Sequence, residues 1–514
     1  MNAPNILLIV SDQERQRDWL PDGYPLPNRQ RLIDGGLEFT QYYTHTSPCS
    51  PSRATLFTGQ YMAEHGVTEN STGPENPVLS YDTPTLGHML RDQGYTTAYK
   101  GKWHLENTAF PNMEAYGFGD WEGNDQSWWG LAGTGTEYDG PIAEQSAGWI
   151  RDHANDDQPW FLAVGMVNPH DIMWFPIDQQ WYWEQDPDYY EMARKRLSLR
   201  DWGRKDNLPP FPHELDRWFT ELPANFDDDL HTKPEVHRRW MTQMVRRGSP
   251  GIMELDDTDI WLKHLDYYAQ LHQLNDAHVG TILDAMDDTG QWDDTIVIFT
   301  SDHGDQCGSH QLRSKGPWNY QETMRIPLYM VAPGITEPGT KTDALASHPD
   351  LATTIAEFAG VDVSERPTLH GESMAPIFED RDAAKIRDFV LFAQEWPWYA
   401  GVEHTRYASS GIFDGRYKYC RYYGVGGGND AAGNPLTGDK MLYGRAASFE
   451  DHDHEFYDLH EDPHELVNLA MDRSRRDEVR RRFAELRTIE DETYGADWVN
   501  KTMAPSVATS TNTL

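Results

Sequence analysis

The chain has 514 residues, too many for one ordinary hydrophobic core, so its length predicts two domains, one of them large. It carries 83 acidic and 44 basic residues, a net charge of −39, and a surface of that sign repels nucleic acid and anionic membranes, so we expect neither as a partner. The same charge repels anionic small molecules, so a site for one of them has to be a local basic pocket.

The chain contains no run approaching the roughly 20 apolar residues of a membrane span. It begins with Met1 to Pro4 and enters the apolar run Ile6 to Val10 without a basic start or a small-residue cleavage site. We therefore expect no secretory signal and a cytoplasmic protein. The cysteines Cys49, Cys307 and Cys420 are too few for a disulfide framework, which agrees with a reducing compartment.

Two apolar runs each lead into an aspartate. Asn5 to Val10 is followed by Ser11 and Asp12, and Thr295 to Thr300 is followed by Ser301 and Asp302. Continuous apolar runs are typical of buried strands in a parallel sheet. Because ligands of open α/β sheets bind at the carboxyl ends of the strands, we expect these two distant aspartates to meet.

Further elements alternate along the chain. Strands are predicted at Thr96 to Tyr99, Trp160 to Val167 and Ile326 to Val331. Helices are predicted over Pro84 to Gln93, with Thr83 as N-cap and Pro84 in the first turn, and over about Ile260 to Met286, where apolar residues recur at helical spacing. The alternation predicts an α/β fold with a large, mostly parallel central sheet flanked by helices.

Two regions depart from this alternation. Residues 180–255 are rich in Trp, Tyr, Asp, Arg and Pro with little periodicity, and we expect an insertion over one face of the sheet. After about residue 380, antiparallel strands are predicted at Phe389 to Phe392 and Tyr417 to Tyr423, followed by a Gly-rich loop, Gly424 to Lys440, and a helix over about Arg473 to Glu490.

The predicted domains are therefore a large domain over residues 1–380, which contains the insertion, and a smaller α+β domain over 381–514, built on an antiparallel sheet. We expect the tail from Lys501 to be loose.

The run Ser47 to Gly59 is the most informative part of the chain. Pro51 suits the first turn of a helix and Ser50 is a good N-cap, which puts Cys49 at the mouth of a helix running toward Phe57. Free N–H groups and the helix dipole favour an anion at that place, and Arg53 adds a positive charge one turn along. The alternative is a buried structural cysteine on an ordinary strand-to-helix turn.

The residues Cys49, Pro51, Ser52 and Arg53 resemble the C-x-P-S-R signature of type I sulfatases, in the alkaline-phosphatase-like superfamily. The resemblance implies that Cys49 is oxidised after synthesis to formylglycine by a formylglycine-generating enzyme. It extends from Asn5 to about Ala470, with residues 180–255 as its weak part.

Asp12 and the pair Asp302 and His303, followed by Gly304, have residue types that suit a hard divalent cation, and an imidazole ligand shifts the preference toward Mn²⁺ or another transition metal. Taken singly, a strand-end aspartate is also a common helix cap or turn former. The resemblance implies one divalent ion, Ca²⁺ or Mn²⁺, held by Asp12, Gln13, Cys49, Asp302 and His303. Gln13 stands where many sulfatases have a second aspartate, which removes one negative charge.

Lys102 and His104 would share one face of a strand, as the period of two requires. The resemblance implies that Lys102, Lys315 and Arg53 bind the sulfuryl oxygens and that His170 or Lys315 protonates the leaving alcohol. It also implies that His104 takes the proton whose removal expels sulfate, and it places Asn70 near the nucleophile. The alternatives are a solvated strand end for Lys102 and His104 and a loop cap for His170.

These observations predict a sulfatase that hydrolyses small-molecule sulfate monoesters. One rival is a phosphonate monoester or phosphodiester hydrolase with the same nucleophile, which Gln13 and Asn70 favour and Lys102 with His104 disfavours. A rival of another class is a non-catalytic binding protein on a sulfatase scaffold.

The leaving group is not encoded in a recognisable motif. Several tryptophans in the middle of the chain could line an aromatic cleft for an aryl, steroid or cationic group. The alternative is that they are core residues. They include Trp128, Trp129, Trp174, Trp181 and Trp183. The oligomeric state stays open, with a homo-oligomer as one option.

Overall fold

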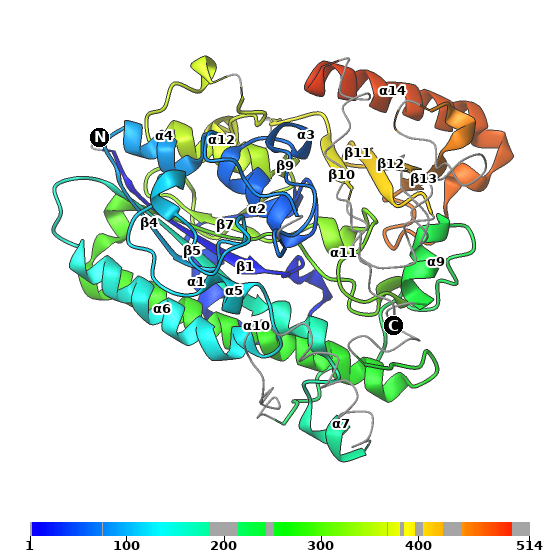
Figure 1. Cartoon of the computed structure of the whole chain (residues 1–514), viewed down its shortest axis with the longest axis horizontal. Coiled ribbons are helices and arrows are strands. Elements are labelled where there is room, and N and C mark those ends of the chain that lie inside the picture. The colour runs from blue at the N-terminus through cyan, green and yellow to red at the C-terminus, as the bar shows by residue number, and fades with distance from the viewer. Residues whose placement is uncertain are drawn as a thin grey trace.

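The computed structural model describes residues 3–73, 76–185, 214–242, 251–366, 368–380, 385–395, 405–424, 445 and 447–495. Figure 1 shows a central sheet with helices on both faces and, at one end, a smaller sheet covered by a long C-terminal helix. This arrangement confirms the predicted α/β class with an antiparallel C-terminal sheet. The boundary predicted near residue 380 stays a prediction, because residues 381–384 lie outside the described residues.

Within the described residues the central sheet has seven strands in the order β4-β5-β1-β6-β7-β2-β8. Their bounds are β1 Asn5–Asp12, β2 Leu37–Phe39, β4 Thr96–Gly101, β5 Trp160–Pro169, β6 Thr295–Ser301, β7 Leu328–Val331 and β8 Thr340–Thr342. The strands β4, β5, β1 and β6 run parallel. Because β1 lies in the middle with helices on both faces, every residue after Asn5 is buried, and the strand is apolar almost throughout.

The strand predicted over Ile326 to Val331 is present as β7, but it pairs antiparallel with both β6 and β2. A pair of short strands, β3 Tyr42–Tyr43 and β9 Ala346–Ser347, lies outside the main sheet.

Helices cover each face of the central sheet (Figure 1). One face carries α2 Cys49–Thr58, α4 Leu86–Asp92 and α12 His348–Phe358, and the other carries α1 Pro27–Gly35, α6 Thr134–Asp152 and α10 Thr258–Thr289. The predicted periodic helix is α10, whose Val279, Ile282 and Leu283 are buried in one cluster with Leu7 and Ile9 of β1. Alternate residues of β1 therefore enter the cores of opposite faces.

The predicted start of α4 is wrong by two residues. Thr85, not Thr83, is the N-cap, and its hydroxyl oxygen accepts from the main-chain N–H of His88 while the His88 side chain reaches back to the Thr85 N–H. Thr83 instead closes a turn by donating its N–H to the Ser80 carbonyl. A reciprocal capping box satisfies two donors at the helix start, which a cap at Thr83 would leave open.

Only parts of the predicted insertion are described, including α7 Gln180–Gln185 and α9 Glu235–Met241. Residues 186–213 and 243–250 lie outside the described residues, as do 425–440 of the predicted Gly-rich loop and the tail from Lys501. The remaining short helices are α3 Met62–His65, α5 Asp125–Trp128, α11 Gln321–Met324 and α13 Ala375–Glu379.

The smaller sheet has the order β10-β11-β12-β13 and is antiparallel throughout. Its strands are β10 Val390–Gln394, β11 Ala408–Phe413, β12 Tyr417–Tyr423 and β13 Asp453–Asp458. The predicted C-terminal helix is α14 Arg476–Tyr494, whose Val479, Leu486 and Ile489 pack against this sheet. It starts later than predicted because Arg473–Arg475 forms a separate 3-10 turn capped by Asp472.

No helix in the described part of the chain combines the length and the apolar character that crossing a membrane requires.

Candidate active site

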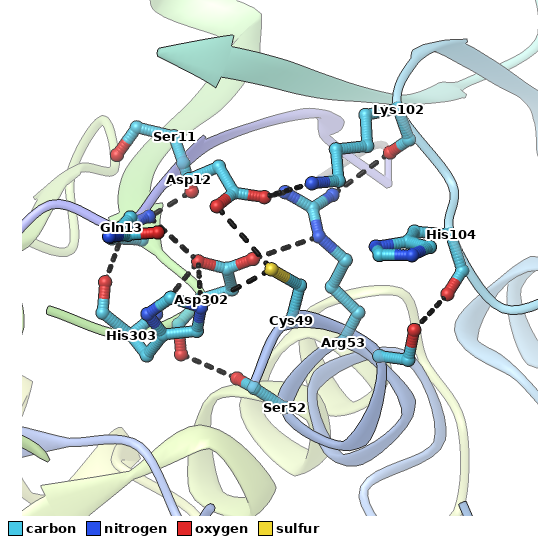
Figure 2. Close-up of polar contacts among 12 residues, drawn as sticks. Ser11, Asp12, Gln13, Cys49, Ser52, Arg53, Lys102, His104, Asp302 and His303 are labelled. Carbon is cyan, nitrogen blue, oxygen red and sulfur yellow. Dashed lines mark hydrogen bonds and ion pairs between the residues drawn. The ribbon is translucent and has the colours of Figure 1, made fainter. Parts of the chain in front are cut away.

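Four strands of the central sheet end at one edge, and predicted site residues lie there. Ser11 and Ser301 are the last partners of the parallel β1 and β6 pair, so Asp12 and Asp302 come next on adjacent strands. Lys102 follows β4 and His170 follows β5. Figure 2 shows Asp12, Lys102, His104, Asp302 and His303 around Cys49 and Arg53 of α2.

Cys49 is the first residue of α2 and its side chain is fully buried. The predicted N-cap is wrong: Ser50 lies inside the first turn, and its hydroxyl donates to the His104 carbonyl at 2.5 Å. The Ser50 N–H is not free either, since it donates to the Asn70 side-chain oxygen at 3.0 Å. The positive environment of Cys49 therefore comes mainly from side chains rather than from open N–H groups of the helix.

Arg53 lies one turn beyond Cys49 and binds both strand-end carboxylates. Its Nε donates to Asp302 at 2.9 Å, one terminal nitrogen donates to Asp12 at 3.2 Å, and the other donates to the Lys102 carbonyl at 2.9 Å. Gly165 of β5 leaves room for this contact, because a Cβ there would lie 2.3 Å from the Lys102 oxygen. The guanidinium group therefore holds the acidic residues in place as well as adding positive charge.

Two lysines approach the same centre with different partners. Lys102 pairs with Asp12 at 2.6 Å. Lys315 Nζ lies 3.4 Å from Cys49 Sγ, 2.5 Å from Gln13 Oε1 and 3.3 Å from Met173 Sδ. Among the described residues, no carboxylate lies within ion-pair distance of Lys315, which makes it the cation most available to an incoming anion.

His104 and His170 are buried with unused ring nitrogens. Within the described chain, neither nitrogen of His104 and not the Nδ1 of His170 has a hydrogen-bond partner. Burial, together with Lys102 for His104 and Lys315 for His170, lowers the pKa of each imidazole well below its usual value. Both rings are therefore neutral at pH 7 and can accept or share a proton with a group bound between them.

Two carboxylates, an imidazole and Cys49 form a compact set of donor atoms. One atom each of Asp12, Cys49, Asp302 and His303 lies within 4.8 Å of the others. His303 Nδ1 is bound to the Gly304 carbonyl at 2.9 Å, which leaves Nε2 facing Cys49 Sγ at 3.4 Å. Carboxylate oxygens with one imidazole nitrogen suit Ca²⁺ or Mn²⁺, so the residues present fit the divalent ion implied by the sequence.

The two carboxyl groups of this set differ electrostatically. Burial and the nearby Asp12 raise the pKa of Asp302 to about 6. Burial also disfavours the charged form of Asp12, but Lys102, His170 and Arg53 outweigh it and hold the pKa of Asp12 well below its usual range. Asp12 is therefore the permanent negative charge of the site.

Gln13 has a more constrained place than the sequence suggests. Its φ of 69° turns the chain sharply after β1. Its side-chain nitrogen donates to Asp305 at 2.5 Å and its oxygen accepts from Lys315 at 2.5 Å. The oxygen thus faces the Cys49 pocket and is shared with Lys315, while Asp305 fixes the orientation of the amide.

Some residues of this site escaped prediction from sequence. The Asp125 carboxylate accepts the main-chain N–H groups of Trp103 and His104, each at 2.9 Å, and no motif marks it. Of the noted tryptophans, Trp129 stacks on His104, whereas Trp174 donates to the Gly130 carbonyl and Trp181 packs on Phe175. The side chains of Trp128 and Trp183 lie outside the described residues.

Cys307 does not reach the site. Its sulfur is buried 3.7 Å from His264 Nδ1, among residues that are not part of the Cys49 pocket.

The fold and the group of charges around Cys49 define a hydrolase of the alkaline-phosphatase-like class. The sulfatase family model matches residues 4–361, more than half of the chain, and the chain belongs to the sulfatase family. A second model, for the C-terminal part of N-sulphoglucosamine sulphohydrolase, matches residues 308–427.

Proteins similar to this chain carry names of different hydrolases. The choline-sulfatase of Rhizobium meliloti is 26% identical over 81% of this chain and 78% of its own. The multifunctional alkaline phosphatase superfamily protein PehA of Trinickia caryophylli is also 26% identical, over 92% of each chain. The crystal structure of the phosphonate monoester hydrolase of Agrobacterium radiobacter has a TM-score of 0.67 at 21% identity, covering 95% of this chain and 96% of its own, a likeness of fold.

Proposed function

We propose that this protein hydrolyses sulfate monoesters of small alcohols or phenols, using a formylglycine made from Cys49 and one divalent ion, Ca²⁺ or Mn²⁺. The observation that carries the proposal is the convergence of Arg53, Lys102 and Lys315 on the buried Cys49, inside a chain of net charge −39. An acidic protein that buries three cations beside one side chain has a pocket suited to an anionic group.

A divalent ion and the formylglycine made from Cys49 would complete this pocket. Asp12, Gln13, Asp302, His303 and the oxidised Cys49 would hold the ion. Formylglycine would supply the attacking oxygen and the ion would polarise it and the ester.

The chain's own side chains then stabilise and move charge. Lys102 and Lys315 lie where sulfuryl oxygens would accumulate negative charge, and preorganised cations in a buried site supply the largest part of such catalysis. Arg53 keeps Asp12 and Asp302 in place. Lys315 donates the proton that the departing alcohol needs, the neutral His170 hydrogen-bonds the ester oxygen, and the neutral His104 accepts a proton when sulfate leaves.

A phosphonate monoester or phosphodiester hydrolase is the second candidate. Gln13 in place of a second carboxylate makes the ion site one charge less negative, and Asn70 binds the first turn of α2. The shared fold with a phosphonate monoester hydrolase supports the same alternative. Lys102 and His104 at the pocket support the sulfatase reading.

The test is a comparison of kcat/KM for matched aryl sulfates and aryl phosphonate monoesters. The protein is co-expressed with a formylglycine-generating enzyme, and the conversion of Cys49 is measured by peptide mass. We expect the sulfate ester to be preferred at least about tenfold, a difference of 1.4 kcal/mol in transition-state binding.

A preference for the phosphonate would overturn the proposal in favour of the second candidate. A Cys49 thiol that stays unmodified, with no ester cleaved, would favour a binding protein on this scaffold.

A further inference from the structure

We propose that Asp125 is a positioning residue that holds the His104 imidazole in its working orientation, partly through the main chain and partly through Trp129. The inference rests on the proposed function, because it concerns the residue that accepts a proton there.

The His104 ring lacks the usual means of orientation. A histidine that handles a proton is normally fixed by a hydrogen bond on its second nitrogen. Among the residues described here, neither ring nitrogen of His104 has such a partner, although the side chain is fully buried. Its orientation therefore has to come from its main chain and from the surfaces that it packs against.

The main chain of His104 is held from both sides. Its φ is 61°, in the left-handed region that a residue with a Cβ adopts only when its surroundings impose it. Asp125 accepts the His104 N–H at 2.9 Å and the Trp103 N–H at 2.9 Å, and Ser50 donates to the His104 carbonyl at 2.5 Å. The Asp125 carboxylate thus provides the contact on the N–H side of the turn.

The same carboxylate places the surface on which the ring rests. The Trp129 indole N–H points to Asp125 at 3.4 Å, and the indole stacks on His104 with centroids 5.7 Å apart and planes 24° apart. The Trp129 carbonyl accepts from Lys102 at 3.2 Å. Asp125 therefore contacts both the His104 main chain and the Trp129 ring that supports the imidazole, and Trp129 in turn contacts Lys102.

Gly130, the residue after Trp129, packs directly against His170. Gly130 has a φ of 102°, and a Cβ there would lie 2.0 Å from the His170 ring. Its carbonyl accepts from the Trp174 indole at 2.8 Å, which fixes the backbone against the imidazole. The segment from Asp125 to Gly130 therefore lies against His104 and His170, the two histidines of the site that have unused nitrogens among the described residues.

The contact that holds Lys102 in the anion pocket does not depend on Asp125, unlike the contacts that orient His104. It keeps its own ion pair with Asp12 at 2.6 Å whatever happens to Asp125, so the anion pocket survives when the His104 support is lost. Loss of Asp125 should therefore lower kcat much more than it changes KM.

The experiment compares Asp125→Asn with a matched control, Asp266→Asn. Asp266 of α10 also accepts two successive main-chain N–H groups, from Trp218 at 2.8 Å and Phe219 at 3.0 Å, but it lies outside the site. On whichever ester the wild type cleaves, we expect D125N to lower kcat by about 10–100-fold with KM within about threefold, since small misplacements of reacting groups have costs of this size. D266N should stay within about twofold of the wild-type kcat.

The effect should disappear when His104 is absent. In a His104→Ala background, D125N should change kcat by less than about threefold, because residues that act through one another are not additive. The inference would be overturned if D125N lowered kcat by the same factor, about 10–100-fold, in the His104→Ala background. A wild-type kcat in D125N alone would also overturn it.

A readout without turnover keeps this inference separate from the proposed function. In ¹⁵N-histidine NMR, the His104 signals are identified by their loss in His104→Ala. We expect them to shift or broaden in D125N and to stay in place in D266N, even if no ester is cleaved. Unchanged His104 signals in D125N would contradict the inference.

Discussion

Both sheets of this protein have buried positive charges beside them, but the partners of these charges differ. In the smaller sheet, Arg421 of β12 pairs with Glu490 of α14 at 2.6 Å. Ser410 accepts from Arg421 at 3.0 Å and donates to Glu490 at 2.5 Å, and the Arg445 carbonyl accepts a further Arg421 N–H at 2.8 Å. Within the described residues, the polar groups of this network are therefore paired with one another.

At the edge of the central sheet the network stays open. Lys315 contacts a sulfur and an amide oxygen at Cys49 and Gln13, with no carboxylate partner among the described residues. His104 also keeps unused ring nitrogens in this part of the described chain. Because a buried charge or polar group without a partner is costly, such an arrangement persists where a ligand supplies the partner. Closed buried networks thus indicate structure, and open ones indicate a site.

The largest expected effect comes from removing the centre of the open network. Cys49→Ala deletes the side chain from which the proposed nucleophile is made, so kcat/KM should fall by at least about 10³-fold. The buried site accepts a smaller apolar side chain, so the melting temperature should stay within a few degrees of the wild type. Initial rates and thermal unfolding measure the two quantities. Retained activity would show that Cys49 is not the catalytic centre.

A paired substitution tests the comparison directly. Arg421→Met leaves Glu490 buried without its main counter-charge, so it should lower the free energy of unfolding by about 3–5 kcal/mol while the activity per folded molecule is kept. Lys315→Met strands no carboxylate among the described residues, so stability should hold while kcat/KM falls by about 10²–10³-fold. Urea unfolding and initial rates separate the two outcomes. If Lys315→Met destabilised the fold as Arg421→Met does, the distinction between the networks would fail.

The smallest expected effect concerns Asp178, a buried carboxyl group bound by Tyr267 at 2.5 Å. Burial raises the pKa of Asp178 to about 7, against an ordinary value of 3.8. The folded state thus binds this proton more tightly than the unfolded state, so the stabilisation is complete below about pH 4 and is lost as the pH rises through about 7. Asp178→Asn cannot titrate, so its unfolding free energy should fall less between pH 5 and pH 8, by about 2–3 kcal/mol. Equal slopes in urea unfolding at the two pH values would contradict this assignment.

Elements with a strong local signal were predictable. The strands β1 and β6 are continuous apolar runs because both of their faces are covered, and α10 carries its apolar residues at helical spacing. The order of residues around Cys49 and the aspartates at two strand ends then located the site. These signals are local, so the amino-acid sequence by itself determined the class of fold and the residues that we propose as the centre of the chemistry.

Tertiary contacts decided the rest. Ser50 looked like a cap, but its hydroxyl bonds the distant His104 carbonyl, and β7 runs antiparallel although its own pattern carries no direction. Asp125 lies 21 residues beyond His104 without a motif, and the Gln13 side chain is oriented by Asp305 and Lys315, 292 and 302 residues away. A side chain's hydrogen-bond partner depends on which distant segments the fold brings beside it, and neither spacing nor composition encodes that choice.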